Sequence, residues 1–140
     1  MISSEKNSIL IVDDEVSNIA VLSRLLSPEY TVYAAKNGML ALNMARKHLP
    51  DVILLDIVMP DMDGYAVLSE LKSMPETREI PVIFITGLDS NNDEERGLAL
   101  DAADYISKPF SKIIVKLRVY NQIKFVNAMR TIAQLKNSNK

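Results

Sequence analysis

The sequence contains no cysteine, no tryptophan and a single histidine, His48. The absence of cysteine excludes disulfides, thiolate metal sites and thiol catalysis. One histidine is too few for a metal site built from histidines. Acidic and basic residues nearly balance, at 18 and 16, which leaves a formal net charge of −2. This balance indicates neither a basic surface nor an acidic tail, so we expect no direct binding to nucleic acid.

Long apolar runs are also missing. No apolar stretch approaches the ~20 residues that a membrane-spanning helix requires. Residues 1–8 are polar and lack the apolar segment of a signal peptide. We therefore expect no association with a membrane and a cytoplasmic location. The 140 residues, 48% of them hydrophobic, suit one domain with a single core.

Short apolar runs mark the predicted strands. They lie at residues 9–12, 52–55 and 82–85, with a weaker run at 103–106 and a more mixed one at 31–35 that suits an edge position. The first three runs are apolar on consecutive residues, without alternation. That pattern is typical of strands that are covered on both faces, as in parallel sheets flanked by helices.

Helical patterns lie between and after these runs. They cover residues 15–27, 38–48, 64–73, 92–100 and about 111–135. Five βα units in series predict an α/β fold with an open, doubly wound parallel sheet and an extended C-terminal helix. The pattern alone leaves the strand order open.

Polar residues follow four of the five predicted strands. Asp13 and Asp14 follow the first, Asp56 the third, Thr86 ends the fourth, and Lys108 follows the fifth. The carboxyl ends of parallel strands share one edge of the sheet, where ligands bind in open α/β folds. We therefore expect three carboxylates, a hydroxyl and an ammonium group to meet there.

Taken singly, these residues have simpler interpretations. Asp14 and Asp61 could cap helices, Thr86 could be there because β-branched residues favour strands, and Lys108 could be a solvated lysine. His48 most simply interacts with the carboxyl end of the second helix. Their joint occurrence at successive strand ends is what favours a functional site.

Three clustered carboxylates point to a hard cation. They repel one another, so at least one is difficult to ionise without a counter-charge. Mg²⁺ prefers oxygen ligands, needs one or two carboxylates and keeps several waters. A carboxylate such as Asp56 can also act as a nucleophile and form an acyl phosphate. Lys108 and the metal would balance the charge of the transferred group, Thr86 would hydrogen-bond it, and Gly87 would leave room for a donor.

These residues resemble the receiver domain of bacterial two-component response regulators, including the chemotaxis receivers. The resemblance runs from about Asn7 to Ile123 and rests on Asp13-Asp14, Asp56 followed by Met59-Pro60-Asp61-Met62-Asp63-Gly64, Thr86-Gly87 and Tyr105-Ile106-Ser107-Lys108-Pro109-Phe110. It implies a (βα)₅ fold with the flavodoxin-like strand order 2-1-3-4-5, and a receiver domain at residues 7–123.

The resemblance also implies roles for the residues of the site. Asp56 would accept a phosphoryl group from the phosphohistidine of a sensor histidine kinase or a phosphotransfer protein. Asp14, Asp56 and the backbone carbonyl of Val58 would bind Mg²⁺ directly, and Asp13 would bind it through water. The domain would thus be a phosphoacceptor that phosphorylates itself with Mg²⁺, and not an enzyme in the usual sense.

The same resemblance assigns a switch. Lys108 would bind a phosphoryl oxygen, and its bond to Pro109 would be cis, which proline makes accessible. Thr86 and Tyr105 would form the switch pair, the hydroxyl moving toward the phosphoryl group and the ring turning inward. Val58 and Leu88 are apolar where family side chains influence hydrolysis, so we expect slow self-dephosphorylation.

The C-terminal segment, residues 124–140, extends beyond the receiver pattern. Phe125, Ala128, Ile132 and Leu135 are spaced 3–4–3, as in a short coiled-coil seam. We expect a helical extension that links to an output domain outside this chain and forms a homodimer. The alternatives are a helix that folds back onto its own domain and a frayed tail. The extension resembles that of regulators with cyclic-dinucleotide signalling outputs.

Three other functions compete with this interpretation. An aspartyl-phosphate phosphatase would use a similar strand-end Asp but needs a second acid two residues later, where this chain has Val58. A flavodoxin-like flavin carrier needs a hydroxyl- and glycine-rich phosphate loop after the first strand, where this chain has Asp13-Asp14-Glu15. A receiver that works only as a constitutive scaffold would not need the complete residue set.

Overall fold

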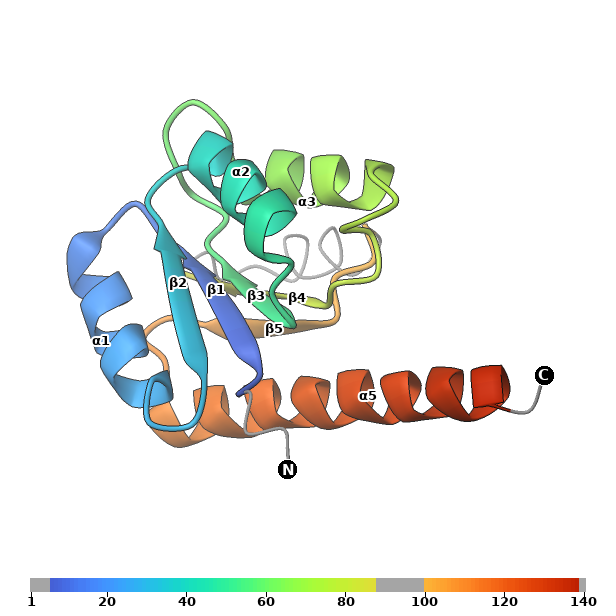
Figure 1. Cartoon of the computed structure of the whole chain (residues 1–140). Helices are drawn as coiled ribbons and strands as arrows, with labels where there is room; N and C mark the ends of the chain where they lie inside the picture. The colour runs from blue at the N-terminus through green and yellow to red at the C-terminus, as the bar shows by residue number, and fades with distance from the viewer. Residues whose placement is uncertain (1–5, 88–99, 139–140) are drawn as a thin grey trace.

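The computed structural model describes residues 6–87 and 100–138 and forms an α/β domain with a central parallel sheet (Figure 1). Its elements are β1 (Ser8–Val12), α1 (Val16–Leu26), β2 (Thr31–Ala35), α2 (Gly38–His48), β3 (Val52–Leu55), α3 (Gly64–Ser73), β4 (Val82–Thr86), β5 (Asp104–Ser107) and α5 (Lys112–Ser138). The sheet order is β2-β1-β3-β4-β5, with all pairs parallel. The predicted fold class and strand order are confirmed.

Alternate residues of the central strands serve two separate hydrophobic layers. Leu10, Ile53 and Phe84 face one layer, which α2 and α3 complete. Ile9, Leu54 and Ile83 face the other, which α1 and α5 complete. Figure 1 shows these helix pairs on opposite sides of the sheet. The strands are apolar on consecutive residues because neither face reaches water.

Local signals fix most of the helix boundaries. The side chains of Asn37 and Asp63 accept hydrogen bonds from the backbone N–H groups of Leu40 and Ala66, each at 2.9 Å, and so cap α2 and α3. The expected helices at 15–27, 38–48 and 64–73 agree with the structure within a residue. The expected helix at 92–100 lies, apart from Leu100, outside the described residues.

The last helix has two differently packed halves. Val115, Val119 and Ile123 are buried against the sheet, which confirms a helix that completes the domain. The helix then continues to Ser138, three residues beyond the predicted end, and is about 40 Å long at 1.5 Å per residue. Its second half runs along the amino-terminal edge of the sheet and past it (Figure 1). In the described part of the chain, no helix carries an apolar stretch sufficient to span a membrane.

Candidate functional site

The backbone ladder of the sheet positions the site residues. The N–H of Asp13 donates to the carbonyl of Ala35 at 3.2 Å, and the N–H of Asp56 donates to the carbonyl of Val12 at 2.9 Å. The N–H of Lys108 donates to the carbonyl of Thr86 at 2.8 Å. Each of these residues therefore sits within the hydrogen-bonded frame at the carboxyl edge, which restricts the direction of its side chain.

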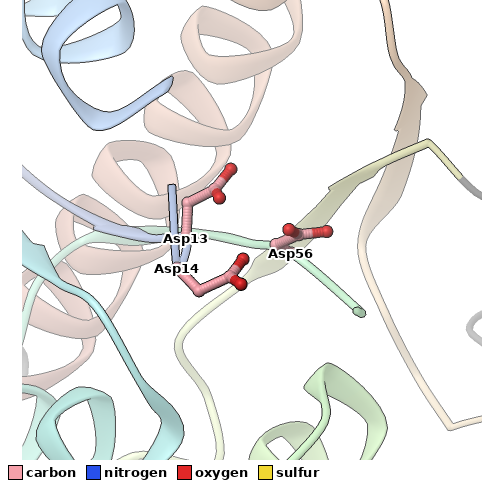
Figure 2. A group of neighbouring side chains, drawn as sticks. All are labelled: Asp13, Asp14 and Asp56. Atoms are coloured by element: carbon pink, nitrogen blue, oxygen red, sulfur yellow. The ribbon is translucent and has the colours of Figure 1, made fainter. Parts of the chain in front are cut away.

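The structure brings the three predicted carboxylates together. Asp13, Asp14 and Asp56 each offer a carboxylate oxygen, and these atoms all lie within 4.8 Å of one another. Figure 2 shows the three side chains emerging next to each other from the ends of β1 and β3. Asp13 and Asp56 are buried, at 0% and 4% exposure, whereas Asp14 is exposed. The cluster thus has a buried side and a side open to solvent.

Lys108 supplies the positive charge of the site. Its Nζ lies 2.9 Å from Oδ2 of Asp13 and 3.3 Å from Oδ2 of Asp56. One ammonium group therefore bridges two buried carboxylates, and the pair of contacts raises the pKa of Lys108 although burial acts in the opposite direction. The single cation balances only part of the charge of three carboxylates.

The surroundings of Asp56 disfavour the ionised form of its carboxyl group. Burial raises its pKa, and the nearby charge of Asp13 adds to the rise, while Lys108 and the Thr86 hydroxyl oppose it. Its Oδ1 atom is buried and accepts no hydrogen bond from the residues that the structure describes. A buried polar atom without a partner is rare, and at an acidic cluster it is consistent with a site for a bound ion, a water or a reacting group.

This arrangement fits a hard divalent cation. The donors are carboxylate oxygens, one of them without a hydrogen-bond partner in residues 6–87 and 100–138, and the cluster has an excess of negative charge. Mg²⁺ satisfies oxygen donors of this kind while keeping waters on its open side. The exposed position of Asp14 leaves that open side in contact with solvent.

Asp13 has a supporting network that the sequence interpretation missed. Its Oδ1 accepts from the N–H of Glu15 at 2.9 Å, and its Oδ2 accepts from the side-chain amide of Asn18 at 3.2 Å. Asn18 lies in the first turn of α1. The only sequence signal for its contact with Asp13 is that it follows the acidic end of β1 by about one helical turn. With Lys108 included, both oxygens of Asp13 are engaged within the protein.

The remaining predicted residues surround this centre. Thr86 is fully buried at the end of β4, and Tyr105 is half-buried in β5, packed against the hydrophobic layer that α2 and α3 complete. Val58 presents its side chain to solvent at 57% exposure, and Leu88 lies outside the described residues. The Lys108–Pro109 bond is cis, as predicted.

The loop after Asp56 is built around Gly64. The N–H of Gly64 donates to the carbonyl of Ile57 at 2.8 Å and brings the start of α3 against the strand end. Asp63 caps α3, and Asp61 adopts a left-handed conformation with φ of 71°. Asp63 is thus the cap of α3, whereas Asp61, which the sequence also suggested as a cap, is an exposed residue of the loop.

His48 packs against another aromatic ring. Its ring stacks on that of Tyr33, with centroids 4.1 Å apart, in the last turn of α2. This stacking was not anticipated from the sequence, which suggested only an interaction with the helix end. Nothing in the contact places His48 near the acidic cluster.

The chain has a doubly wound parallel sheet, and its polar site lies at the carboxyl ends of the strands. It is therefore an α/β domain of the open-sheet class, in which ligands bind at that edge. Residues 9–119 match the response regulator receiver domain family. The chain belongs to this family and is a receiver domain of two-component signalling.

Similar proteins support the assignment. The chain is 45% identical over 116 residues to a probable cyclic di-GMP phosphodiesterase of Vibrio cholerae, covering 83% of this chain and 26% of that protein. It is 44% identical over 118 residues to the response regulator PleD of Caulobacter vibrioides, covering 84% and 26%. The chain thus spans about a quarter of the length of these curated relatives.

Solved structures agree with the fold. A receiver domain of a signal transduction histidine kinase from Syntrophus aciditrophicus has a TM-score of 0.79 and 35% identity, covering 86% of this chain and 92% of that one. A putative response regulator from Chloroflexus aurantiacus has a TM-score of 0.81 and 30% identity, covering 86% and 99%.

The raised pKa of Asp56 leads to a prediction about Mg²⁺ and pH. A raised pKa means that the ionised form of Asp56 reduces the stability of the folded state above that pKa, and that this cost disappears as the pH falls below it. We expect Asp56→Asn to stabilise the metal-free protein at neutral pH by on the order of 1 kcal/mol. Mg²⁺ should stabilise the wild type, and this effect should fade as the pH falls through the raised pKa.

Thermal melts with and without Mg²⁺ between neutral and acidic pH test this prediction. Asp61→Asn is the matched control, because it removes the same charge from an exposed residue of the same loop, and asparagine accepts its left-handed backbone. A Mg²⁺ effect of equal size in the wild type and in Asp56→Asn would contradict the prediction.

Proposed function

We propose that the chain accepts a phosphoryl group on Asp56 in a Mg²⁺-dependent reaction. The observation that carries the proposal is the state of the Asp56 carboxylate: Oδ2 faces the ammonium of Lys108 at 3.3 Å, and Oδ1 is buried without a hydrogen-bond partner among the described residues. One oxygen is thus oriented by a cation while the other keeps its lone pairs for reaction.

In the proposed step, a carboxylate oxygen of Asp56 attacks the phosphorus of a phosphohistidine. The new O–P bond forms as the P–N bond breaks, and the imidazole of the donor leaves with the electron pair. The donor is a sensor histidine kinase or a phosphotransfer protein. Lys108, already beside Asp56, contacts an oxygen of the transferred group and balances its charge.

The bound cation would neutralise the negative charge shared by the transferring group and the acidic cluster. Asp14, Asp56 and the backbone carbonyl of Val58 would hold it directly. Asp13 would hold it through water, which agrees with both of its oxygens being engaged by Asn18, Lys108 and the N–H of Glu15.

Thr86 and Tyr105 would convert the modification into a change of shape. They occupy adjacent strands, with Thr86 fully buried at the site and Tyr105 half-buried behind it. Movement of the hydroxyl toward the phosphoryl group would vacate space that the ring of Tyr105 can fill. The changed face of β5 would then be read by an output domain or a partner.

The proposal is tested by adding Mg²⁺ and acetyl phosphate and measuring the intact mass. We expect the wild type and Asp61→Asn to gain one phosphoryl group, and Asp56→Asn to gain none. Omission of Mg²⁺ should prevent the gain in the wild type and in Asp61→Asn. A wild type that stays unmodified would favour the constitutive scaffold, and colour from a bound flavin would indicate a flavodoxin-like carrier.

Val58 leads to a prediction about the lifetime of the phosphoryl group. Its side chain is apolar and exposed at the mouth of the site, so it cannot orient an attacking water. We expect slow self-dephosphorylation, and Val58→Gln should accelerate it by about tenfold, because an amide can position water. The rate of mass loss after removal of the donor measures this effect. Loss within seconds from the wild type would contradict it.

The C-terminal extension is proposed to form a homodimer and to lead to an output domain. Phe125, Ile132 and Leu135 are exposed along it, at 60%, 45% and 59%. The relatives named above suggest an output concerned with cyclic di-GMP, since one of them is described as a probable cyclic di-GMP phosphodiesterase. We retain residues 7–123 as the receiver and 124–140 as the extension.

Sedimentation of the full chain beside Ile132→Ser/Leu135→Ser tests the dimer. We expect a dimer for the full chain and a monomer for the variant, because two of the four apolar residues of the seam are lost without removing any part of the helix that contacts the domain. Equal masses for both proteins would reject the seam as the interface.

A further inference from the structure

Asp51 is a buried carboxylate that the phosphorylation site does not use. It lies directly before β3 at the amino-terminal edge of the sheet and is 7% exposed. One of its oxygens, Oδ2, accepts from the N–H of Ser8 at 2.7 Å and from the side-chain amide of Asn7 at 3.2 Å. The other, Oδ1, forms an ion pair with Arg130. Three segments that are distant in sequence therefore converge on one side chain.

A second polar contact lies beside this ion pair. The side-chain amides of Asn7 and Asn127 donate to each other's oxygens at 3.0 Å and 3.2 Å. Asn127 and Arg130 are three residues apart and therefore share one face of α5. The Asn7–Asn127 pair ties the second half of that helix to the start of β1, and the Arg130–Asp51 ion pair ties it to the start of β3.

Apolar packing contributes little to the hold on this part of the helix. A cavity of about 520 Å³ lies between α5 and the loops before β3 and β4, lined among others by Leu49, Ile80, Phe125 and Met129. Phe125 and Met129 remain 60% and 49% exposed. The last buried residue of α5 is Ile123 and Val126 is half-buried, so beyond Ile123 the polar contacts of Asn127 and Arg130 add to a thin apolar contact.

The geometry relates this anchor to the acidic cluster. Asp51 and Asp56 flank β3, and Ser8 and Asp13 mark the two ends of β1, the strand paired with it. The anchor and the acidic cluster thus lie at opposite ends of the same two buried strands. The direction of α5 is therefore set by the strands that also position Asp13 and Asp56.

We propose that Asp51, Arg130 and the Asn7–Asn127 pair form a latch that docks α5 on the amino-terminal edge of the sheet. The latch extends the rigid body of the domain from Ile123 to Arg130 and fixes the direction in which the helix leaves it. Asp51 and Arg130 are positioning residues. Their role does not depend on phosphorylation of Asp56.

Hydrogen–deuterium exchange of the full chain tests the latch. We expect Arg130→Met to accelerate exchange of the amides of residues 124–131 at least tenfold, and Arg130→Met/Asn127→Ala to accelerate it further. The matched control is Lys136→Met, which removes a charge from the same helix outside the latch and should leave residues 124–131 unchanged. Arg130→Lys should restore part of the protection, because it retains the charge that faces Asp51.

A distance measurement tests the direction of the helix independently. Because the chain has no cysteine, Lys47→Cys and Gln134→Cys allow a pair of spin labels on α2 and α5. We expect a narrow distribution of label distances in the otherwise wild-type chain and a broad one with Arg130→Met. The latch is rejected by an unchanged distribution, by unchanged protection of residues 124–131, or by equal acceleration of exchange throughout the sheet.

Discussion

Lys108→Met is expected to destabilise the metal-free protein by about 3 kcal/mol and to slow phosphorylation at least 100-fold. The ammonium lies 2.9 Å from Asp13 and 3.3 Å from Asp56, whose side chains are 1% and 5% exposed. Removing it leaves two buried carboxylates without a cation. The same loss removes the charge that would balance the transferred group, so stability and reactivity should both fall.

The pH dependence of this variant distinguishes the electrostatic cause from a packing defect. Without Lys108, the pKa of Asp56 should rise further, because the group that opposes the effect of burial is gone. The destabilisation should therefore be largest at neutral pH and should shrink as Asp56 becomes protonated at lower pH. In the wild type, the contribution of Lys108 is lost only at strongly alkaline pH, since its own pKa is raised.

Chemical denaturation of Lys108→Met between neutral and acidic pH, with and without Mg²⁺, measures both effects. Mg²⁺ should restore part of the lost stability, because it supplies positive charge to the same carboxylates. Lys112→Met is the control, as Lys112 is an exposed lysine at the start of α5. A destabilisation that is the same at every pH would point to packing and contradict the electrostatic account.

Gly64→Ala is expected to destabilise the domain by roughly 3 kcal/mol or more and to abolish phosphorylation of Asp56. A Cβ atom at Gly64 would lie 2.4 Å from the backbone oxygen of Asp56 and 2.8 Å from Cα of Ile57. Both neighbours are backbone atoms in the segment that presents the acceptor carboxylate. The clash can be relieved only by moving that segment or α3, so the site should lose its geometry.

Gly87→Ala provides the contrast. No atom of the described residues lies within 4 Å of a Cβ at Gly87, so the variant should fold with nearly wild-type stability. Gly38→Ala is intermediate, because its Cβ would meet Sδ of Met62 at 2.8 Å, and a flexible side chain can move away. Thermal melts and the acetyl phosphate assay on the three variants check this order. A stable and reactive Gly64→Ala would show that the loop adapts more easily than the geometry implies.

Much of the site could be predicted because each of its residues is tied to a strand end. An apolar run followed by Asp, Thr or Lys specifies both the strand and the edge at which the side chain emerges, since parallel strands end together. Asp13, Asp56, Thr86 and Lys108 were predicted on this basis. The structure brings Asp13, Asp56 and Lys108 into one cluster, with the Thr86 hydroxyl beside Asp56. The contact between Asn18 and Asp13 was missed, because no periodicity indicates how far the first turn of α1 reaches.

The environments of the two adjacent acids were distinguished only by the structure. Asp13 and Asp14 are equivalent in the sequence pattern, and the resemblance to receivers was needed to assign them. In the structure Asp13 is fully buried and accepts hydrogen bonds from Glu15, Asn18 and Lys108, while Asp14 is exposed beside it. Burial of one residue and exposure of its neighbour depend on how α1 packs after the strand, which is a long-range property.

The C-terminal helix also shows that local sequence predicts an element but not its long-range contacts. Its length and the spacing of its apolar residues follow from local sequence, and the structure confirms a helix across the whole predicted segment. The attachment of Arg130 to Asp51 joins residues 79 positions apart in the chain. No short-range pattern encodes a contact of that kind.

The amino-acid sequence by itself determined the order of strands and helices along the chain and the chemistry at the edge of the sheet. Local propensity and hydrophobic periodicity depend on residues that are close together in the chain, so they can be read from the sequence. Tertiary structure alone decided which acid is buried, which amide supports it and where the last helix is anchored. Those outcomes depend on contacts that exist only once distant segments have packed together.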